Sequence, residues 1–139
     1  EALVIVGDPA FAALFSAQSR AEVPIVAEIA NPAGRGPALK LTGAIDRLAV
    51  TDEAVLIIDY KTNRSVPARV GDVAPVYLYQ LAAYRLALQQ IFAGRPVRAA
   101  LLWTEMPRLM EIPPEILDTY SDMLWQLDPA SLDAARDRS

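Results

Sequence analysis

Cysteine and histidine are both absent from the 139-residue chain. Without cysteine there can be no disulfide framework, no thiolate zinc site and no iron–sulfur cluster, and the composition fits a reducing cytoplasm. Without histidine, every catalytic triad or metal site that needs an imidazole is excluded. The remaining groups for chemistry are carboxylates, lysine, tyrosine and amides.

Long apolar runs and a Gly-rich phosphate loop are also missing. No segment approaches the roughly 20 apolar residues of a membrane span, and the first residues lack the basic start of a signal peptide. The G-x-x-x-x-G-K-[ST] pattern of ATP-binding loops does not occur. A net charge of −4 provides no general attraction to phosphate, so nucleic-acid binding would need a metal, neighbouring domains or a local basic patch. Four arginines near the motifs described below either form such a patch, or are solvated or paired with acidic residues: Arg47, Arg64, Arg69 and Arg85.

Composition and pattern together predict one α/β domain over residues 1–127, followed by a flexible polar tail at 128–139. We expect a short helix after Asp8-Pro9, a helix over about 76–92, and a last helix over about 113–127. Expected strands, in a mixed sheet with the helices packed on it, cover residues 23–29, 39–50, 55–61, 98–104 and 108–112. The chain opens on Glu1 without Met, which indicates a processed chain or a fragment, and we expect a domain truncated on its N-terminal side.

Charged residues interrupt two of the expected strands. Asp59 and Lys61 alternate in VLIIDYK, so their side chains leave the same face. Asp46 interrupts the preceding strand, and the hairpin between them can bring Asp46 beside Asp59. Two carboxylates there could bind Mg²⁺ or Mn²⁺, and Lys61 could stabilise charge on a phosphoryl group. A single Asp or Lys at a strand end is more often structural or solvated.

Three motifs occur in order: G-x-x-D (Gly43–Asp46), D-Y-K-T (Asp59–Thr62) and Q-x-x-x-Y (Gln80–Tyr84). Gln80 and Tyr84 share one face of the expected helix, where a tyrosine is more often core than functional. This set resembles the RecB-type branch of the PD-(D/E)XK nuclease superfamily, with its restriction-endonuclease-like fold. Within that branch the segment order most resembles the C-terminal nuclease domain of the AddA type of helicase–nuclease, which processes double-strand DNA breaks with an AddB subunit.

The resemblance implies a metal-dependent DNA exonuclease, with single-stranded ends of broken duplex as substrate and an AddB-like partner. It implies that Asp46, Asp59 and the Tyr60 backbone carbonyl bind the metal, that Lys61 is the catalytic lysine, and that Gln80 and Tyr84 contact DNA. A further catalytic glutamate would be Glu22, with Glu28 as its rival.

Two departures from the family pattern matter. The upstream metal-binding histidine of RecB-type nucleases has no counterpart, which we attribute to truncation, and any ATP-dependent helicase motor would lie in the missing portion. AddB subunits and CRISPR-adaptation nucleases carry cysteines for an iron–sulfur cluster, so their absence favours the AddA or RecB side. Two other readings stay open: a catalytically inactive nuclease fold that binds DNA or a partner subunit, and a small-molecule α/β domain, which would need a Gly-rich turn.

Overall fold

A computed structural model describes residues 19–62, 65–105 and 108–127. Its elements, in chain order, are β1 (Ser19–Ile29), β2 (Leu39–Val50), β3 (Val55–Lys61), the 3₁₀ turn η2 (Val70–Asp72), α1 (Pro75–Ile91), β4 (Val97–Trp103), β5 (Arg108–Ile112), α2 (Pro114–Asp122) and the 3₁₀ turn η3 (Leu124–Gln126). The helix expected after Asp8, Arg64, and the tail at 128–139 lie outside the described residues.

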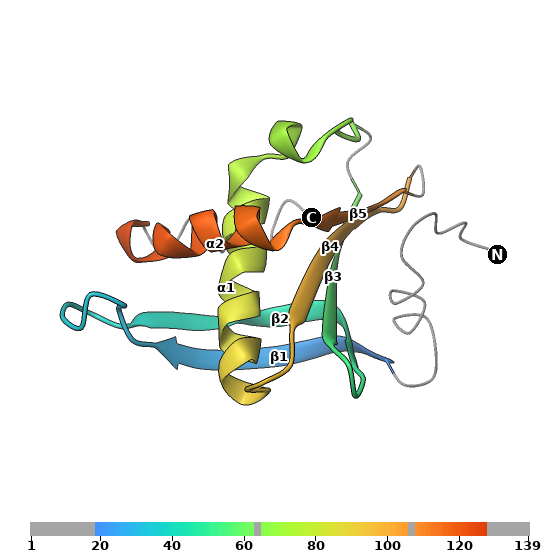
Figure 1. Cartoon of the computed structure of the whole chain (residues 1–139). Coiled ribbons are helices and arrows are strands. Elements are labelled where there is room, and N and C mark those ends of the chain that lie inside the picture. Colours follow the sequence, from blue (N-terminus) through green and yellow to red (C-terminus); the bar gives the residue numbers. More distant parts are fainter. Residues whose placement is uncertain (1–18, 63–64, 106–107, 128–139) are drawn as a thin grey trace.

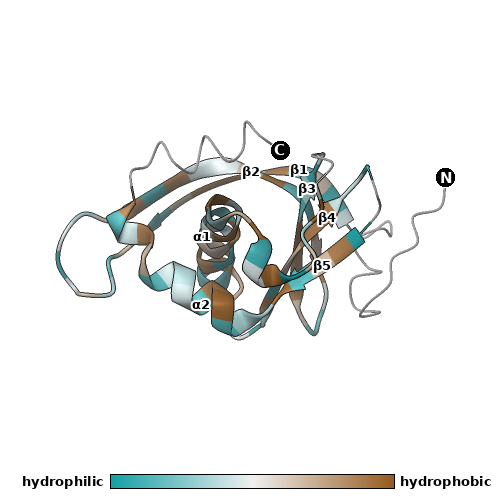
Figure 2. Ribbon diagram, turned by 90° about the horizontal axis from the view of Figure 1, so that it is seen from above, coloured by the Kyte–Doolittle hydropathy of each residue, from teal (hydrophilic) through white to brown (hydrophobic). Residues whose placement is uncertain are grey.

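The strands form one five-stranded sheet in the order β1-β2-β3-β4-β5. β3 and β4 are parallel and are connected through α1, whereas the other neighbouring pairs are antiparallel. The curved sheet wraps around α1, and α2 packs beside α1 on the same face (Figures 1 and 2). This arrangement confirms the expected mixed sheet with packed helices.

β3 occupies the centre of the sheet, and the sequence indicates why. Its apolar run is buried on both faces, with Val55, Leu56, Ile57 and Ile58 all at most 1% exposed. Alternate residues contribute to two clusters: Val55 and Ile57 pack toward α1, while Leu56 and Ile58 belong to a cluster on the opposite face. A strand that is apolar on both sides is stable only where both sides are covered.

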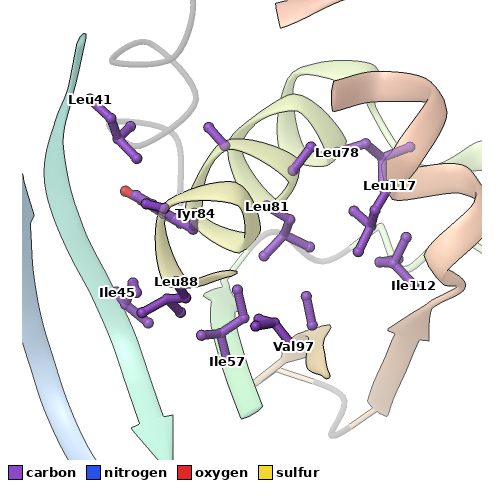
Figure 3. Packing of buried hydrophobic residues seen from close by; sticks show 14 of the residues in the cluster. Leu41, Ile45, Ile57, Leu78, Leu81, Tyr84, Leu88, Val97, Ile112 and Leu117 are labelled. Carbon is purple, nitrogen blue, oxygen red and sulfur yellow. The ribbon is translucent and has the colours of Figure 1, made fainter. Parts of the chain in front are cut away.

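α1 fills the concave face of the sheet. It begins at Pro75, whose fixed φ suits a first helical position, and Gly94, with φ 90°, follows its end. Its residues Leu78, Leu81, Tyr84 and Leu88 point toward side chains from β2, β3, β4 and α2 (Figure 3). The helix therefore connects four elements through one apolar contact surface.

Two element boundaries differ from expectation by four residues or more. β1 begins at Ser19, four residues before the expected start, because the polar segment Ser19–Ala21 pairs with Arg47–Ala49 although its sequence does not look strand-like. The last helix ends at Asp122 and continues only as a 3₁₀ turn over Leu124–Gln126, short of residue 127. Within the described residues, no helix has the length and apolar character to cross a membrane.

Candidate active site

The candidate site lies where β2 and β3 stop pairing. The last partners in their ladder are Arg47 and Ile58, and continuing that register would set Asp46 opposite Asp59. Instead, the Asp46 side chain accepts a hydrogen bond from the Tyr60 backbone N–H, with an N–O distance of 2.8 Å. A carboxylate thus takes the place of a backbone partner and is fixed next to the D-Y-K segment.

Asp46 can face this segment because the alternation of β2 breaks at this point. Ile45 and Leu48 both pack with the cluster on the α1 side, whereas Ala49 belongs to the cluster on the far side. Strict alternation from Ile45 would reverse the positions of Leu48 and Ala49. The break between Ile45 and Leu48 puts Asp46 on the face that Asp59 also occupies.

The partner strand is irregular at the same level. Ala21 pairs with Arg47 and Val23 with Ile45, which leaves Glu22 and Asp46 opposite each other at a gap in the ladder. Glu22 has φ 51°, the only non-glycine residue with positive φ among those described. Such a conformation costs an ordinary residue roughly 1–2 kcal/mol, and strain of this kind gathers at functional sites.

The two candidate glutamates differ in their distance from the site. Glu22 is exposed and lies across from Asp46, whereas Glu28 is exposed and lies across from Lys40. Lys40 is six residues from Asp46 along β2, a separation of about 20 Å in an extended strand. The placement therefore favours Glu22 over Glu28 as a carboxylate near the site, and its role remains a prediction.

Asp59 and Lys61 form a buried ion pair. Asp59 is 6% exposed and Lys61 is fully buried, and the Lys61 Nζ lies 2.6 Å from Asp59 Oδ2. Burial, together with a hydrogen bond to the Asp46 carboxyl, raises the pKa of Asp59 from 3.8 to about 7, although Lys61 acts in the opposite direction. Asp46 and Asp59 are thus in direct contact, with a lysine beside them.

The Lys61 ammonium also faces an aromatic ring that the sequence motifs do not include. Its Nζ lies 3.8 Å from the centroid of the Tyr77 ring, in the first turn of α1. A cation over a ring face is attracted by the negative centre of the ring. The sequence offers one weak signal for Tyr77, since it lies three residues before Gln80 and therefore on a neighbouring face of the same helix.

The two residues of the Q-x-x-x-Y motif are buried. Tyr84 is 3% exposed, and a Cβ built on Gly43 would lie only 2.6 Å from its hydroxyl oxygen. Gly43 thus leaves the space into which the tyrosine hydroxyl fits, which links the first and third motifs by packing. Gln80 is 4% exposed, and its Oε1 has no hydrogen-bond partner among the described residues. DNA contact by either side chain remains a prediction.

Several of the arginines considered for a basic rim have acidic or polar partners. Arg47 donates to the Tyr60 hydroxyl and to Ser19 Oγ. Arg85 is paired with Asp118, at 2.6 Å, and Arg69 with Asp72. These contacts favour the structural interpretation of the three arginines over a free phosphate-binding rim.

The donor set suits a hard divalent cation. The Asp46 and Asp59 carboxyls can share a hydrogen bond only while one of them carries a proton. When both are ionised they repel each other, and a divalent cation between them would remove that repulsion. No group of three or more Asp, Glu, His or Cys side chains that could hold a metal occurs in the described part of the chain. Asp46 and Asp59 would therefore need further oxygen ligands, for which the Tyr60 carbonyl, water and phosphate are available in principle.

Comparison with known proteins identifies a nuclease family. The family model of the PD-(D/E)XK nuclease superfamily matches residues 8–135. The CRISPR-associated exonuclease Cas4 of Francisella tularensis subsp. novicida (strain U112) is 33% identical over 94 residues, which cover 64% of this chain and 44% of that protein. The chain thus spans less than half the length of this curated relative.

A solved structure entitled "Crystal structure of SSO0001" aligns with 80% of this chain and 52% of its own, at 19% identity and a TM-score of 0.44. The family match covers nearly the whole chain and includes all three sequence motifs. Members of this superfamily generally use divalent metal ions, and the mixed sheet with flanking helices is the restriction-endonuclease-like α/β fold. The chain belongs to the PD-(D/E)XK nuclease superfamily.

Proposed function

We propose that this chain is a Mg²⁺- or Mn²⁺-dependent DNA nuclease domain that hydrolyses phosphodiester bonds through Asp46, Asp59 and Lys61. The observation that carries the proposal is the contact between the Asp46 and Asp59 carboxyls at the end of the β2–β3 ladder, with Lys61 paired to Asp59. A buried cluster of this kind is expensive for stability alone, because an ionised pair without metal must be held out of water.

The proposal gives each residue of the site a role. Asp46 and Asp59, with the Tyr60 backbone carbonyl, would bind the cation, which when bound polarises the phosphate and lowers the pKa of a coordinated water. Lys61 keeps its ammonium beside Asp59 and offers positive charge to the phosphoryl oxygens as they gain charge. Glu22, across from Asp46, can accept a proton from the attacking water. Gln80 offers an unpaired buried acceptor, and Tyr84 supports β2 through Gly43.

The finer assignment that we propose is the AddA or RecB type of helicase–nuclease. The domain would then process single-stranded ends of broken DNA for recombination, with an AddB-like partner subunit, in the cytoplasm. The ATP-dependent helicase would be a separate portion of the parent protein. The support is the order of the three motifs and the lack of cysteine, which leaves no ligands in this chain for an iron–sulfur cluster.

The test is metal-dependent cleavage of end-labelled single-stranded DNA by the purified chain. We expect cutting with Mg²⁺ or Mn²⁺, none with a chelator, and losses of at least about a hundredfold in Asp59→Asn and Lys61→Met. Asp59→Asn weakens a metal ligand, and Lys61→Met removes the positive charge that stabilises the transition state. Asp52→Asn and Lys40→Met are matched controls, because Asp52 and Lys40 are exposed and lie outside the site.

Metal binding is measured separately by calorimetry. Asp46→Asn and Asp59→Asn are expected to weaken Mn²⁺ binding, whereas both control variants keep it. A wild-type chain that binds DNA but cuts none in either metal would instead support the inactive binding module. Unchanged cleavage by both Asp59→Asn and Lys61→Met would remove the assigned site.

A further inference from the structure

We infer that Tyr77 is a positioning residue for the nuclease reaction: its ring face holds the Lys61 ammonium in place without neutralising it. The inference rests on the proposed function, since it concerns the lysine that acts in that reaction. Tyr77 lies outside the three sequence motifs, in the first turn of α1, and is half-buried. It meets Lys61 only through the folding of α1 against the end of β3.

The buried Lys61 ammonium needs stabilising groups around it. Its side chain is fully buried, and an ammonium removed from water is unfavourable unless charged or polarisable groups surround it. Asp59 Oδ2 lies 2.6 Å from Nζ on one side, and the centroid of the Tyr77 ring lies 3.8 Å from Nζ on another. The ring is therefore within the range of a strong cation–π contact.

The N-terminal end of α1 is an unfavourable place for an ammonium. The N-terminal end of α1 carries partial positive charge, and its first turn contains no acidic residue that could offset this charge. An ammonium near this end would be repelled by the peptide dipoles. The electron-rich face of the Tyr77 ring supplies the opposing attraction and allows the helix and the lysine to lie side by side.

Beside Lys61, an aromatic ring suits catalysis better than a second carboxylate would. A second carboxylate beside Lys61 would neutralise the ammonium and compete with the phosphate for it. A ring attracts the cation through its quadrupole and carries no net charge, so the positive charge stays available to the substrate. Tyr77 is thus suited to fix the position of Lys61 Nζ beside Asp59.

α1 also provides a matched control. Tyr79 is two residues further along and faces α2, where its ring lies edge-on to Tyr120 with centroids 4.8 Å apart. Its hydroxyl is 3.8 Å from Met123 Sδ. Removing the Tyr79 ring disturbs the packing of the same helix without touching Lys61, so it separates a general loss of packing from a loss of the ring–cation contact.

The experiment measures kcat and KM for single-stranded DNA in saturating Mg²⁺. Tyr77→Phe keeps the ring and is expected to retain kcat, whereas Tyr77→Leu lowers kcat about thirtyfold with little change in KM, the size expected for a desolvated cation–π contact. Tyr79→Leu leaves kcat near the wild-type value. Phenylalanines with one, two and three ring fluorines at position 77 are expected to lower kcat in steps, because fluorine withdraws electron density while changing the ring volume little.

A second readout does not depend on activity. Ring currents from Tyr77 shift the NMR signals of the Lys61 ε-methylene protons upfield, and this shift is expected to persist in Tyr77→Phe and Tyr79→Leu and to vanish in Tyr77→Leu. A flat fluorine series in a wild-type background that cuts DNA would overturn the inference and leave the proposed function standing. A wild-type chain that binds metal and cuts no DNA would overturn the proposed function itself, and the catalytic part of the inference with it.

Discussion

Metal-free protein is expected to lose stability as the pH rises, and Asp59 is the cause. Burial and the contact with Asp46 raise the pKa of Asp59 to about 7 in the folded state, against 3.8 for the ordinary carboxyl. The folded state therefore binds the proton more tightly than the unfolded state does. The stabilisation from this proton is fully present below pH 3.8 and is lost as the pH rises through about 7.

The size of the effect follows from the two pKa values. The full loss across the range corresponds to about 4 kcal/mol, and the part between about pH 5.5 and about pH 8 to about 2 kcal/mol. The side chain of Asp59 is 9% exposed, so solvent screens the effect only weakly.

Urea denaturation at the two pH values, with a chelator present, measures this loss as a difference in the free energy of unfolding. The wild-type protein is compared with Asp59→Asn, which removes the titrating group while keeping its shape, and the difference between the two pH responses isolates Asp59. Asp52→Asn, at an exposed turn, serves as the control and keeps the wild-type response. Equal pH responses in the wild-type protein and Asp59→Asn would refute the reasoning.

Three further predictions concern stability and the site. Gly43→Ala is expected to destabilise the fold by about 1–3 kcal/mol, because its Cβ would meet the Tyr84 hydroxyl, and urea denaturation should show that Tyr84→Phe relieves much of this in the double variant. Leu102→Ala, on the far face of the sheet, should cost about 2–5 kcal/mol in the same assay, and a loss below about 1 kcal/mol would mean that this face is not tightly covered. Glu22→Gly should stabilise the protein by up to about 1 kcal/mol through relief of its positive φ. If the Glu22 carboxylate takes part in the reaction, the same variant loses DNA cleavage, whereas full cleavage would exclude that role.

Local sequence pattern determined much of the fold. The bounds of β2, β3 and β5 coincide with those expected, and α1 and β4 differ by one residue at each end. These elements carry their own signals: a continuous apolar run for β3, a proline at the start of α1, and a glycine after its end. The pairing of Asp59 with Lys61 also follows from sequence, because residues two apart in a strand share a face.

Tertiary structure alone decided how the other groups meet these two. Alternation within β2 would have turned Asp46 away from Asp59, and only the break in β2, matched by the strained Glu22 of β1, brings the carboxyls together. Tyr77 reaches Lys61, and Tyr84 reaches Gly43, only because α1 crosses the concave face of the sheet. Periodicity reports which side of its own element a residue occupies, whereas contacts between elements depend on strand register, sheet curvature and helix placement, which no single segment contains.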